Sequence, residues 1–185
     1  MTANAQPGRL FAVVGPSGAG KDTLIAAARA ARPDLVIVRR VITRPSELGG
    51  EDFDGVTEAD FAARKARGDF ALDWRAHGLR YGLPAAQIAE RHKGRDVLFN
   101  GSRAALDPAA QMFPNLTVIR VTAPSSVLMD RLLARGRESR EDIAARLQRP
   151  SFDLPANLHV IDVLNDGPVE QGVARFLTAL QPVSA

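Results

Sequence analysis

The sequence predicts an α/β protein in which a parallel central sheet is covered by helices on both faces. Short apolar runs of strand length alternate along the chain with stretches of helical character, an order typical of parallel sheets. A glycine-rich segment also joins the first apolar run directly to the first helical stretch. We expect one domain over residues 1–185, because this length suffices for a compact core and no long linker divides it.

Five apolar runs are expected to form the core strands. They span residues 10–14, 35–41, 97–99, 116–121 and 158–163. Residues 43–56 contain one proline and three glycines, so we expect a loop or an irregular sheet there. Short strands are expected at 70–74 and 80–82, around a turn at Gly78.

The expected helices have recognisable ends. Pro33 closes the first, Thr57 is placed to cap the second, and Pro84 stands in the first turn of the third. The expected ranges are 24–31, 57–68, 84–92, a stretch ending near 111, 124–135, 140–149 and 169–180.

The composition excludes several classes of protein. The absence of cysteine excludes disulfides, thiolate metal sites and thiol catalysis. The apolar runs are too short to cross a bilayer and no signal-peptide pattern is present, so we expect a cytoplasmic protein without membrane partners. Aromatic residues make up 5% of the chain, and no stripe of basic residues with interleaved aromatic residues is present. Both features argue against nucleic-acid binding. The cations are nearly all arginine, which suits phosphate ligands, although compositional bias explains most of this excess.

A phosphate-binding loop is the most specific motif. The spacing Gly15-x4-Gly20-Lys21 places glycines where backbone N–H groups can turn toward phosphate oxygens, next to a helix N-terminus and a lysine charge. This motif predicts a P-loop NTPase three-layer fold and ATP as the phosphoryl donor. The expected nucleotide-binding residues are Gly15, Pro16, Ser17, Gly18, Ala19, Gly20, Lys21, Asp22 and Thr23.

The position after the lysine departs from the motif. Serine or threonine is usual there as a Mg²⁺ ligand, but here Asp22 follows Lys21 and Thr23 comes next. Either residue could hold Mg²⁺, directly or through water. Alternatively, Asp22 is a first-turn residue favoured by the helix dipole.

An arginine-rich segment at about residues 131–149 is expected to form a lid. Arginines stabilise the charge that develops on a transferred phosphoryl group, and closure of a lid excludes water. The candidate catalytic residues, with Lys21, are Arg131, Arg135, Arg137 and Arg146. The alternative is a solvated basic face paired to Glu138, Glu141 and Asp142.

These motifs resemble the guanylate kinase superfamily over nearly the whole chain. The resemblance rests on 15–21, Thr43-Arg44-Pro45, Gly50-Glu51, Tyr81-Gly82, Arg135-Gly-x-Glu138 and Asn165-Asp166. It implies a guanylate kinase-like fold with a lid and an acceptor-binding insertion at about residues 40–85. It also implies that Asn165 lies by the adenine of ATP.

The departures from guanylate kinases resemble one branch, the ribose 1,5-bisphosphate phosphokinases of phosphonate metabolism. Arg40 replaces a small hydroxyl residue, Glu47 replaces an arginine, and Asp73 takes the place of the glutamate that reads guanine. The branch-like segments are 40–45, 70–74, 77–82, 100–103 and 135–138.

This resemblance implies transfer from ATP to ribose 1,5-bisphosphate, giving 5-phosphoribosyl 1-diphosphate and ADP. In this interpretation arginines hold the two phosphates of a phosphorylated sugar and Asp73 orients its ribose. The candidate acceptor-binding residues are Arg40, Arg44, Glu51, Asp73, Tyr81, Asn100, Ser102 and Arg103. A nucleoside monophosphate kinase and a non-catalytic guanylate kinase-like binding module are the alternatives, and a homodimer is left open.

Overall fold

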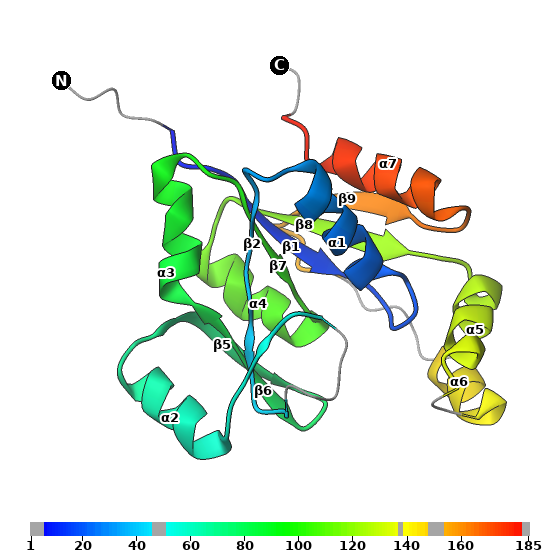
Figure 1. Ribbon diagram of the computed structural model, residues 1–185, viewed down its shortest axis with the longest axis horizontal. Coiled ribbons are helices and arrows are strands. Elements are labelled where there is room, and N and C mark those ends of the chain that lie inside the picture. The colour runs from blue at the N-terminus through cyan, green and yellow to red at the C-terminus, as the bar shows by residue number, and fades with distance from the viewer. Residues whose placement is uncertain (1–5, 46–50, 137–138, 148–153, 183–185) are drawn as a thin grey trace.

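The computed structural model describes residues 6–45, 51–136, 139–147 and 154–182, and its strands form two sheets with helices packed around them (Figure 1). The main sheet is parallel, in the order β2-β7-β1-β8-β9. Its strands are β1 Leu10–Val14, β2 Val36–Ile37, β7 Val97–Asn100, β8 Leu116–Thr122 and β9 His159–Leu164. The predicted parallel α/β architecture is therefore confirmed.

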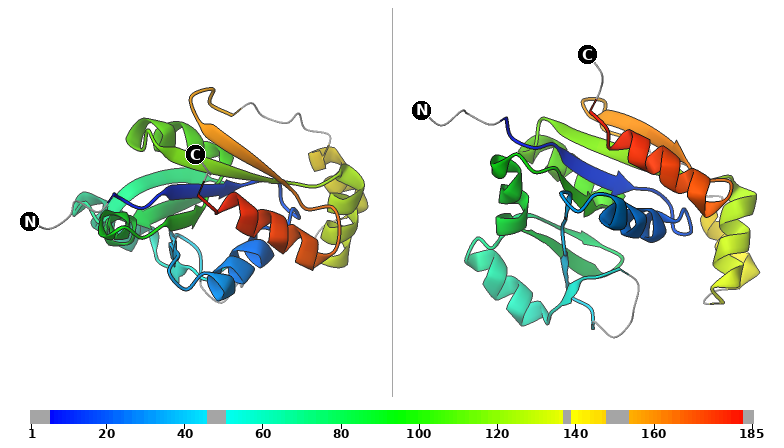
Figure 2. Two further views of the ribbon diagram at one scale, coloured as in Figure 1. Left: turned by 90° about the horizontal axis from the view of Figure 1, so that it is seen from above. Right: turned by 45° about the horizontal axis from the view of Figure 1, so that its top comes forward.

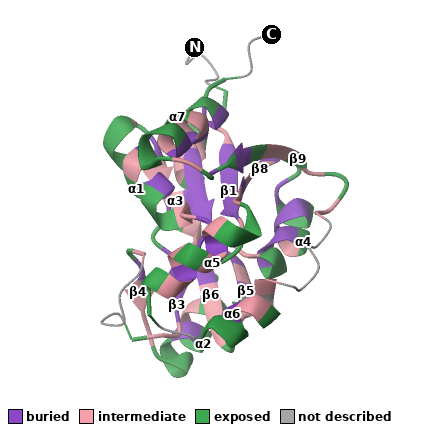
Figure 3. Ribbon diagram, turned by 90° about the vertical axis from the view of Figure 1, so that its right-hand side faces the viewer, coloured by how far each residue is buried: buried purple, intermediate pink, exposed green. Residues whose placement is uncertain are grey.

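Helices cover both faces of this sheet, as the alternation of side chains along β1 requires. Phe11 and Val13 pack in one core cluster with α1 (Lys21–Ala31) and α7 (Val169–Ala179). Residues Leu10, Ala12 and Val14 point the other way and pack in a second cluster against α4, which spans Arg103–Met112. Figure 2 shows α1 and α7 together on one side of the sheet, and Figure 3 shows the buried strands between the exposed faces of the helices.

A smaller mixed sheet extends from the main sheet. Its order is β4-β3-β6-β5, in which β3 and β4 run parallel and the other neighbours antiparallel. The strands are β3 Val41–Ile42, β4 Asp54–Gly55, β5 Phe70–Ala76 and β6 Leu79–Pro84. Helix α2 (Glu58–Ala66) packs against it through Phe61, whose ring lies 4.7 Å from that of Phe70.

The remaining helices lie at opposite ends of the molecule. The helices α5 (Ser125–Ala134) and α6 (Arg140–Leu147) project together from the end of β8 (Figure 1). At the other end, α3 (Ala85–Ile88) continues into the 3-10 helix η2 (Ala89–Lys93). In the part of the chain that the structure describes, no helix is both long and apolar enough to span a membrane.

The structure agrees with most predicted elements and corrects one strand. Residues 35–41 were expected to form a single strand, but β2 ends at Ile37 and β3 begins at Val41, in a different sheet. The intervening backbone leaves the main sheet at Arg39, whose N–H donates to the side chain of Gln87. Apolar character alone did not reveal this crossing. Thr57 caps α2 as predicted, since its hydroxyl accepts a hydrogen bond from the N–H of Asp60.

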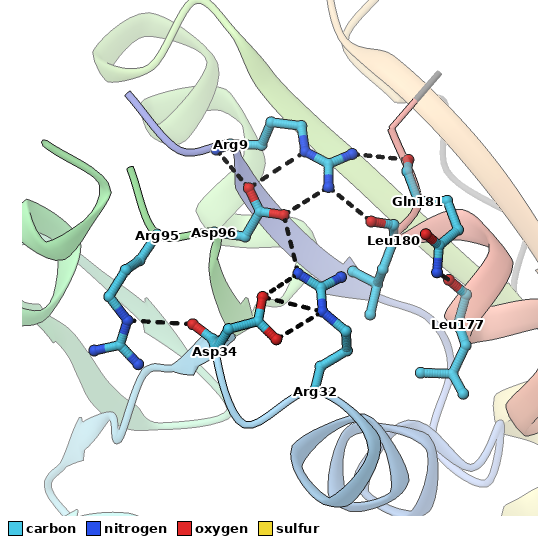
Figure 4. A network of polar contacts seen from close by, with 8 residues as sticks. All are labelled: Arg9, Arg32, Asp34, Arg95, Asp96, Leu177, Leu180 and Gln181. Atoms are coloured by element: carbon cyan, nitrogen blue, oxygen red, sulfur yellow. Dashed lines mark hydrogen bonds and ion pairs between the residues drawn. The ribbon is translucent and has the colours of Figure 1, made fainter. Parts of the chain in front are cut away.

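A partly buried ion-pair network joins the start of β1 to the residues that follow α7 (Figure 4). Asp96, immediately before β7, accepts hydrogen bonds from the backbone and the guanidinium of Arg9, and the guanidinium of Arg32 lies 3.5 Å from its carboxylate. Arg9 also donates to the carbonyl oxygens of Leu180 and Gln181, just after α7. Burial alone would raise the pKa of Asp96, but the hydrogen bonds from Arg9 and the positive charges outweigh it, so the pKa is lowered.

The lowered pKa of Asp96 gives a pH-dependent stability. Because the folded pKa lies below the unfolded value of about 3.9, the stabilisation is complete above that pH and is lost as pH falls through the folded pKa. We expect Asp96→Asn to lower the free energy of unfolding by about 1–2 kcal/mol at pH 7. The difference from wild type should narrow below about pH 4.

Urea denaturation from pH 3 to 7 measures this effect. Asp162→Asn is the matched control, because Asp162 also pairs with an arginine, Arg120, but both side chains are exposed. Asp162→Asn should lower the free energy of unfolding by less than about 0.5 kcal/mol. An equal decrease in the free energy of unfolding for the two variants would contradict a larger stabilising contribution from Asp96.

Candidate active site

The phosphate-binding loop has a backbone that only glycine tolerates at critical positions. Gly20 has a φ of 92° and stands immediately before α1, where a Cβ would come within 2.5 Å of the Asn165 side chain. A Cβ at Gly15 would lie 2.2 Å from the carbonyl oxygen of Val121. The loop thus lies close to the chain on two sides, with the N-terminus of α1 beside it as an anion-binding element.

Lys21 lies over this loop. Its ammonium group donates hydrogen bonds to the carbonyl oxygens of Gly15 at 2.8 Å and Pro16 at 3.2 Å. These bonds hold the charge across the mouth of the loop, where a phosphate oxygen can replace a carbonyl oxygen as acceptor.

The electrostatic surroundings of Lys21 favour an anionic ligand. Burial lowers its pKa most, and the positive charges of Arg40 and Arg135 lower it further, while Asp22 and Glu51 act in the opposite direction. A bound phosphate would add negative charge beside the ammonium group and so stabilise its protonated form.

Three polar side chains are buried in the described part of the molecule, and all three belong to this region. They are Arg40, Asn100 and Asn165, exposed by 8%, 9% and 6%. A buried polar group is costly unless it is hydrogen-bonded, so their concentration at one place indicates a functional site.

Asn100 joins the loop to the acceptor side. It ends β7, next to β1, and its amide Nδ2 donates to Asp22 Oδ1 at 3.2 Å and to Glu51 Oε2 at 2.9 Å. The other carboxylate oxygen of Glu51 accepts from Nε of Arg40 at 2.9 Å and also from its Nη2. Predicted site residues from four segments are thus linked by side-chain hydrogen bonds.

An aromatic pair lies under Arg40. The rings of Trp74 and Tyr81 face each other across β5 and β6, stacked 5.3 Å apart and inclined by 7°. The guanidinium carbon of Arg40 lies 5.0 Å from the centre of the Tyr81 ring and 5.9 Å from that of Trp74. In the sequence analysis Trp74 enters only as part of the branch-like segment 70–74, and no pattern in the sequence placed it near Arg40.

The structure does not bring Asp73 into this group. Asp73 neighbours Trp74 in the strand, so its side chain points to the opposite face of the sheet. There its Oδ1 accepts a hydrogen bond from Lys65 of α2, at 2.8 Å.

The other expected acceptor residues lie at the edges of the group. Arg44 follows β3, and its guanidinium carbon lies 4.4 Å from the centre of the buried Phe53 ring. Ser102 and Arg103 begin α4 just after Asn100, where they extend the site along that helix end. Ser102 has a buried hydroxyl without a hydrogen-bond partner among the described residues.

The structure describes two of the four predicted lid arginines completely. Arg131 in α5 approaches the phosphate loop, with Nη1 3.5 Å from the carbonyl oxygen of Gly18. Arg135 follows the same helix. Arg137 and Glu47 lie outside the described residues, and for Arg146, within α6, the same holds for its side chain.

A cavity of about 260 Å³ separates the loop from α5 and α7. Its lining includes Gly20, Thr23, Arg131, Arg135 and Asn165. Asn165 was expected beside an adenine, and it does line this cavity. Its amide, however, donates to the carbonyl oxygen of Ala19 at 2.7 Å, so the residue also supports the phosphate loop.

A larger hollow of about 490 Å³ lies between α2, β6 and α3. Its two arginines are already paired, Arg64 with Asp54 and Arg67 with Asp69, each at 2.7 Å. We therefore place the active site at the phosphate loop, where unlike charges converge beside backbone donors.

Comparison with known proteins agrees with this geometry. No protein-family model matches the chain. It is 46% identical to "Ribose 1,5-bisphosphate phosphokinase PhnN" of Rhizobium etli, over 99% of this chain and 94% of that protein. The chain belongs to the ribose 1,5-bisphosphate phosphokinase family. This assignment confirms the branch that the sequence motifs indicated.

Longer relatives contain the same family region. The chain is 49% identical, over 94% of its length, to the "Bifunctional ribose 1,5-bisphosphokinase-thymidine phosphorylase" of Cupriavidus necator. It spans less than a third of that relative and of two others with the same name.

A solved structure supports the fold. The guanylate kinase of Anaplasma phagocytophilum matches with a TM-score of 0.65 at 18% identity, covering 95% of this chain and 85% of that one. At this identity the likeness shows the fold alone, which is the predicted guanylate kinase-like one.

Lys21 provides a direct test of the phosphate loop. We expect Lys21→Ala to lower kcat by about 100-fold or more, because the ammonium charge acts on phosphate oxygens. The thermal midpoint should change little, since the side chain does not contribute to the apolar core. Phosphoryl transfer and thermal unfolding are measured on the same preparations.

The control is Lys93→Ala, which removes an exposed ammonium group paired with Glu90. It should leave kcat within about twofold of wild type, as expected for surface pairs that contribute little. A Lys21→Ala protein as active as this control would contradict the assignment.

Proposed function

We propose that the chain transfers the γ-phosphoryl group of ATP to the 1-phosphate of ribose 1,5-bisphosphate, giving 5-phosphoribosyl 1-diphosphate and ADP. The observation that carries this proposal is the match to single-function relatives of the same length. Three of them, named ribose 1,5-bisphosphate phosphokinase, are 43–46% identical over 93–100% of this chain and at least 94% of their own. The second activity in the name of the bifunctional relatives is not part of the proposal.

The chemistry of this acceptor fits the charges of the site. Its nucleophile is a phosphate oxygen that is largely ionised at neutral pH, so no strong general base is needed. Catalysis then depends on bringing two polyanions together and on neutralising the transferred group. Cations converge from the loop, the lid and the acceptor side, namely Lys21, Arg131, Arg135 and Arg40.

The proposed roles follow from these positions. Lys21 and the loop backbone hold the β- and γ-phosphates, and Arg131 and Arg135 stabilise the transferred group from the lid. Arg137 and Arg146 are proposed as further lid residues from the sequence motif alone.

The acceptor phosphates are proposed to contact Arg40, Arg44 and Arg103. Ser102 has a buried hydroxyl that an acceptor oxygen could satisfy. Glu51, Asn100 and Tyr81 act through Arg40. We leave Asp73 out of the acceptor set, because it faces α2 and pairs with Lys65. Asn165 supports the loop and the nucleotide cavity.

The residues after Lys21 suit magnesium. In the residues that the structure describes, no three His, Cys, Asp or Glu side chains gather as a metal site. Mg²⁺ usually takes one or two protein ligands and completes its shell with phosphate oxygens and water, so the carboxylate of Asp22 and the hydroxyl of Thr23 are sufficient. When bound, Mg²⁺ would neutralise charge on the β- and γ-phosphates.

An acceptor screen tests the proposed reaction. With ATP and Mg²⁺, kcat/KM for ribose 1,5-bisphosphate should exceed that for GMP or AMP by about 100-fold or more, because a site without base-reading groups gains nothing from a nucleobase. ADP release and product formation are measured together, with an acceptor-free reaction as control. A higher kcat/KM for GMP would show that the chain is a nucleoside monophosphate kinase.

A second test concerns Asp22. If its carboxylate holds Mg²⁺, Asp22→Ser should raise the Mg²⁺ concentration that gives half-maximal rate by about threefold or more, since a hydroxyl is the weaker ligand. Mg²⁺ titration at saturating ATP measures this shift, and Asp107→Ser, a change outside the site in α4, is the control. An unchanged Mg²⁺ curve would leave Asp22 as a first-turn residue favoured by the dipole of α1.

A further inference from the structure

Trp74 is the side chain at the site for which the proposed reaction gives no role. It is 5% exposed and packs in the core cluster between the smaller sheet and α4. Its indole nitrogen is buried and has no hydrogen-bond partner among the described residues. An unpaired buried donor is unfavourable by about 1–3 kcal/mol, and phenylalanine or leucine would pack there without this cost.

Unlike leucine, the indole of Trp74 provides an aromatic face next to the buried cation of Arg40. Tryptophan attracts a guanidinium more strongly than tyrosine or phenylalanine does, and this attraction increases when both groups are shielded from water. The guanidinium of Arg40 is within range of the Trp74 ring at 5.9 Å, and the parallel Tyr81 ring lies closer, at 5.0 Å. Because Arg40 is only 8% exposed, the condition of shielding is met.

Arg40 is also held by the carboxylate of Glu51, which contacts the guanidinium along one edge. Glu51 engages two of the five N–H donors of the guanidinium, along the edge that carries Nε and Nη2. Asn100 holds Glu51 in turn and bonds to Asp22 beside the loop. The rings therefore contact the guanidinium on one side and Glu51 restrains one edge, while its remaining donors, which have no acceptor among the described residues, can meet an oxyanion.

We infer that Trp74 is a positioning residue for the acceptor: with Tyr81, its ring orients the guanidinium of Arg40 so that Arg40 can bind an acceptor phosphate beside the phosphate loop. This inference rests on the proposed function and adds a determinant of acceptor affinity. Trp74 acts through Arg40 and does not contact the reacting atoms.

A double-mutant cycle on the acceptor KM tests the inference. Trp74→Leu should raise the KM for ribose 1,5-bisphosphate by about 5- to 20-fold, and Trp74→Phe by less, since a ring is retained. The KM for ATP should change by less than about twofold in both variants. In an Arg40→Met background, Trp74→Leu should have almost no further effect on the acceptor KM. An equal rise in both backgrounds would overturn the inference.

A matched control separates positioning from packing. Phe113 belongs to the same core cluster, is also 5% exposed, and lies under the guanidinium of Arg91 at 5.4 Å. Phe113→Leu should lower the thermal midpoint about as much as Trp74→Leu without raising the acceptor KM. A comparable KM rise in Phe113→Leu would assign the effect of Trp74 to general loss of packing.

A fluorescence measurement is independent of the acceptor's identity. Trp74 is the single tryptophan of the 185-residue chain, so emission excited selectively at tryptophan reports on its surroundings alone. Removing the cation in Arg40→Met should change the emission intensity or maximum of the ligand-free protein. If Arg40→Met folds poorly, Arg40→Met/Glu51→Gln avoids an unpaired carboxylate and serves instead. Unchanged emission in a folded variant would refute the contact, whereas a failed acceptor screen with changed emission would refute only the proposed reaction.

Discussion

The buried charge of Arg40 is the constraint on which the rest of the site depends. A guanidinium removed from water needs a carboxylate and a polarisable surface, and these come from Glu51 and from the paired rings of Trp74 and Tyr81. Glu51 then needs a donor for its second oxygen, which Asn100 provides. Satisfying one charge therefore orders residues from both sheets and links them, through Asn100 and Asp22, to the phosphate loop.

This arrangement keeps opposite charges balanced before any ligand arrives. Lys21 and Arg40 are like charges close enough to affect each other, and Asp22 and Glu51 offset them. The carboxylates of Asp22 and Glu51 thus offset the repulsion between the two cations, so both cations can stay in place before a ligand binds. The site can then exchange carbonyl and carboxylate partners for the oxygens of an anionic ligand, so little reorganisation is needed when such a ligand binds.

The parts of the fold that the sequence predicted are those encoded locally. The phosphate-loop motif is nine contiguous residues, 15–23, that follow β1 and run into the first turn of α1, and the core strands show as separate apolar runs. The division of 35–41 between two sheets was missed, because apolar character does not show where a chain leaves one sheet for another. The orientation of Asp73 was also missed, because apolar character does not show the register in which two strands pair. The pairing of β5 and β6 shifts register between Phe70 and Leu72, and such a shift decides which side chains face the site. The inferred role of Trp74 depends on Arg40, which approaches it from another segment and is held there by Glu51.

The Arg9–Asp96 network has a consequence for the architecture of longer chains. It ties the start of β1 to the residues after α7, at the amino ends of the parallel strands, whereas the phosphate loop follows the carboxyl end of β1. Both ends of the described chain therefore leave the molecule on the side away from the catalytic loop (Figure 1). Additional domains joined at either end would extend from that remote side, leaving the phosphate loop and the neighbouring helix α5 unobstructed. A kinase unit built this way can be carried within a larger polypeptide while its own site stays unchanged.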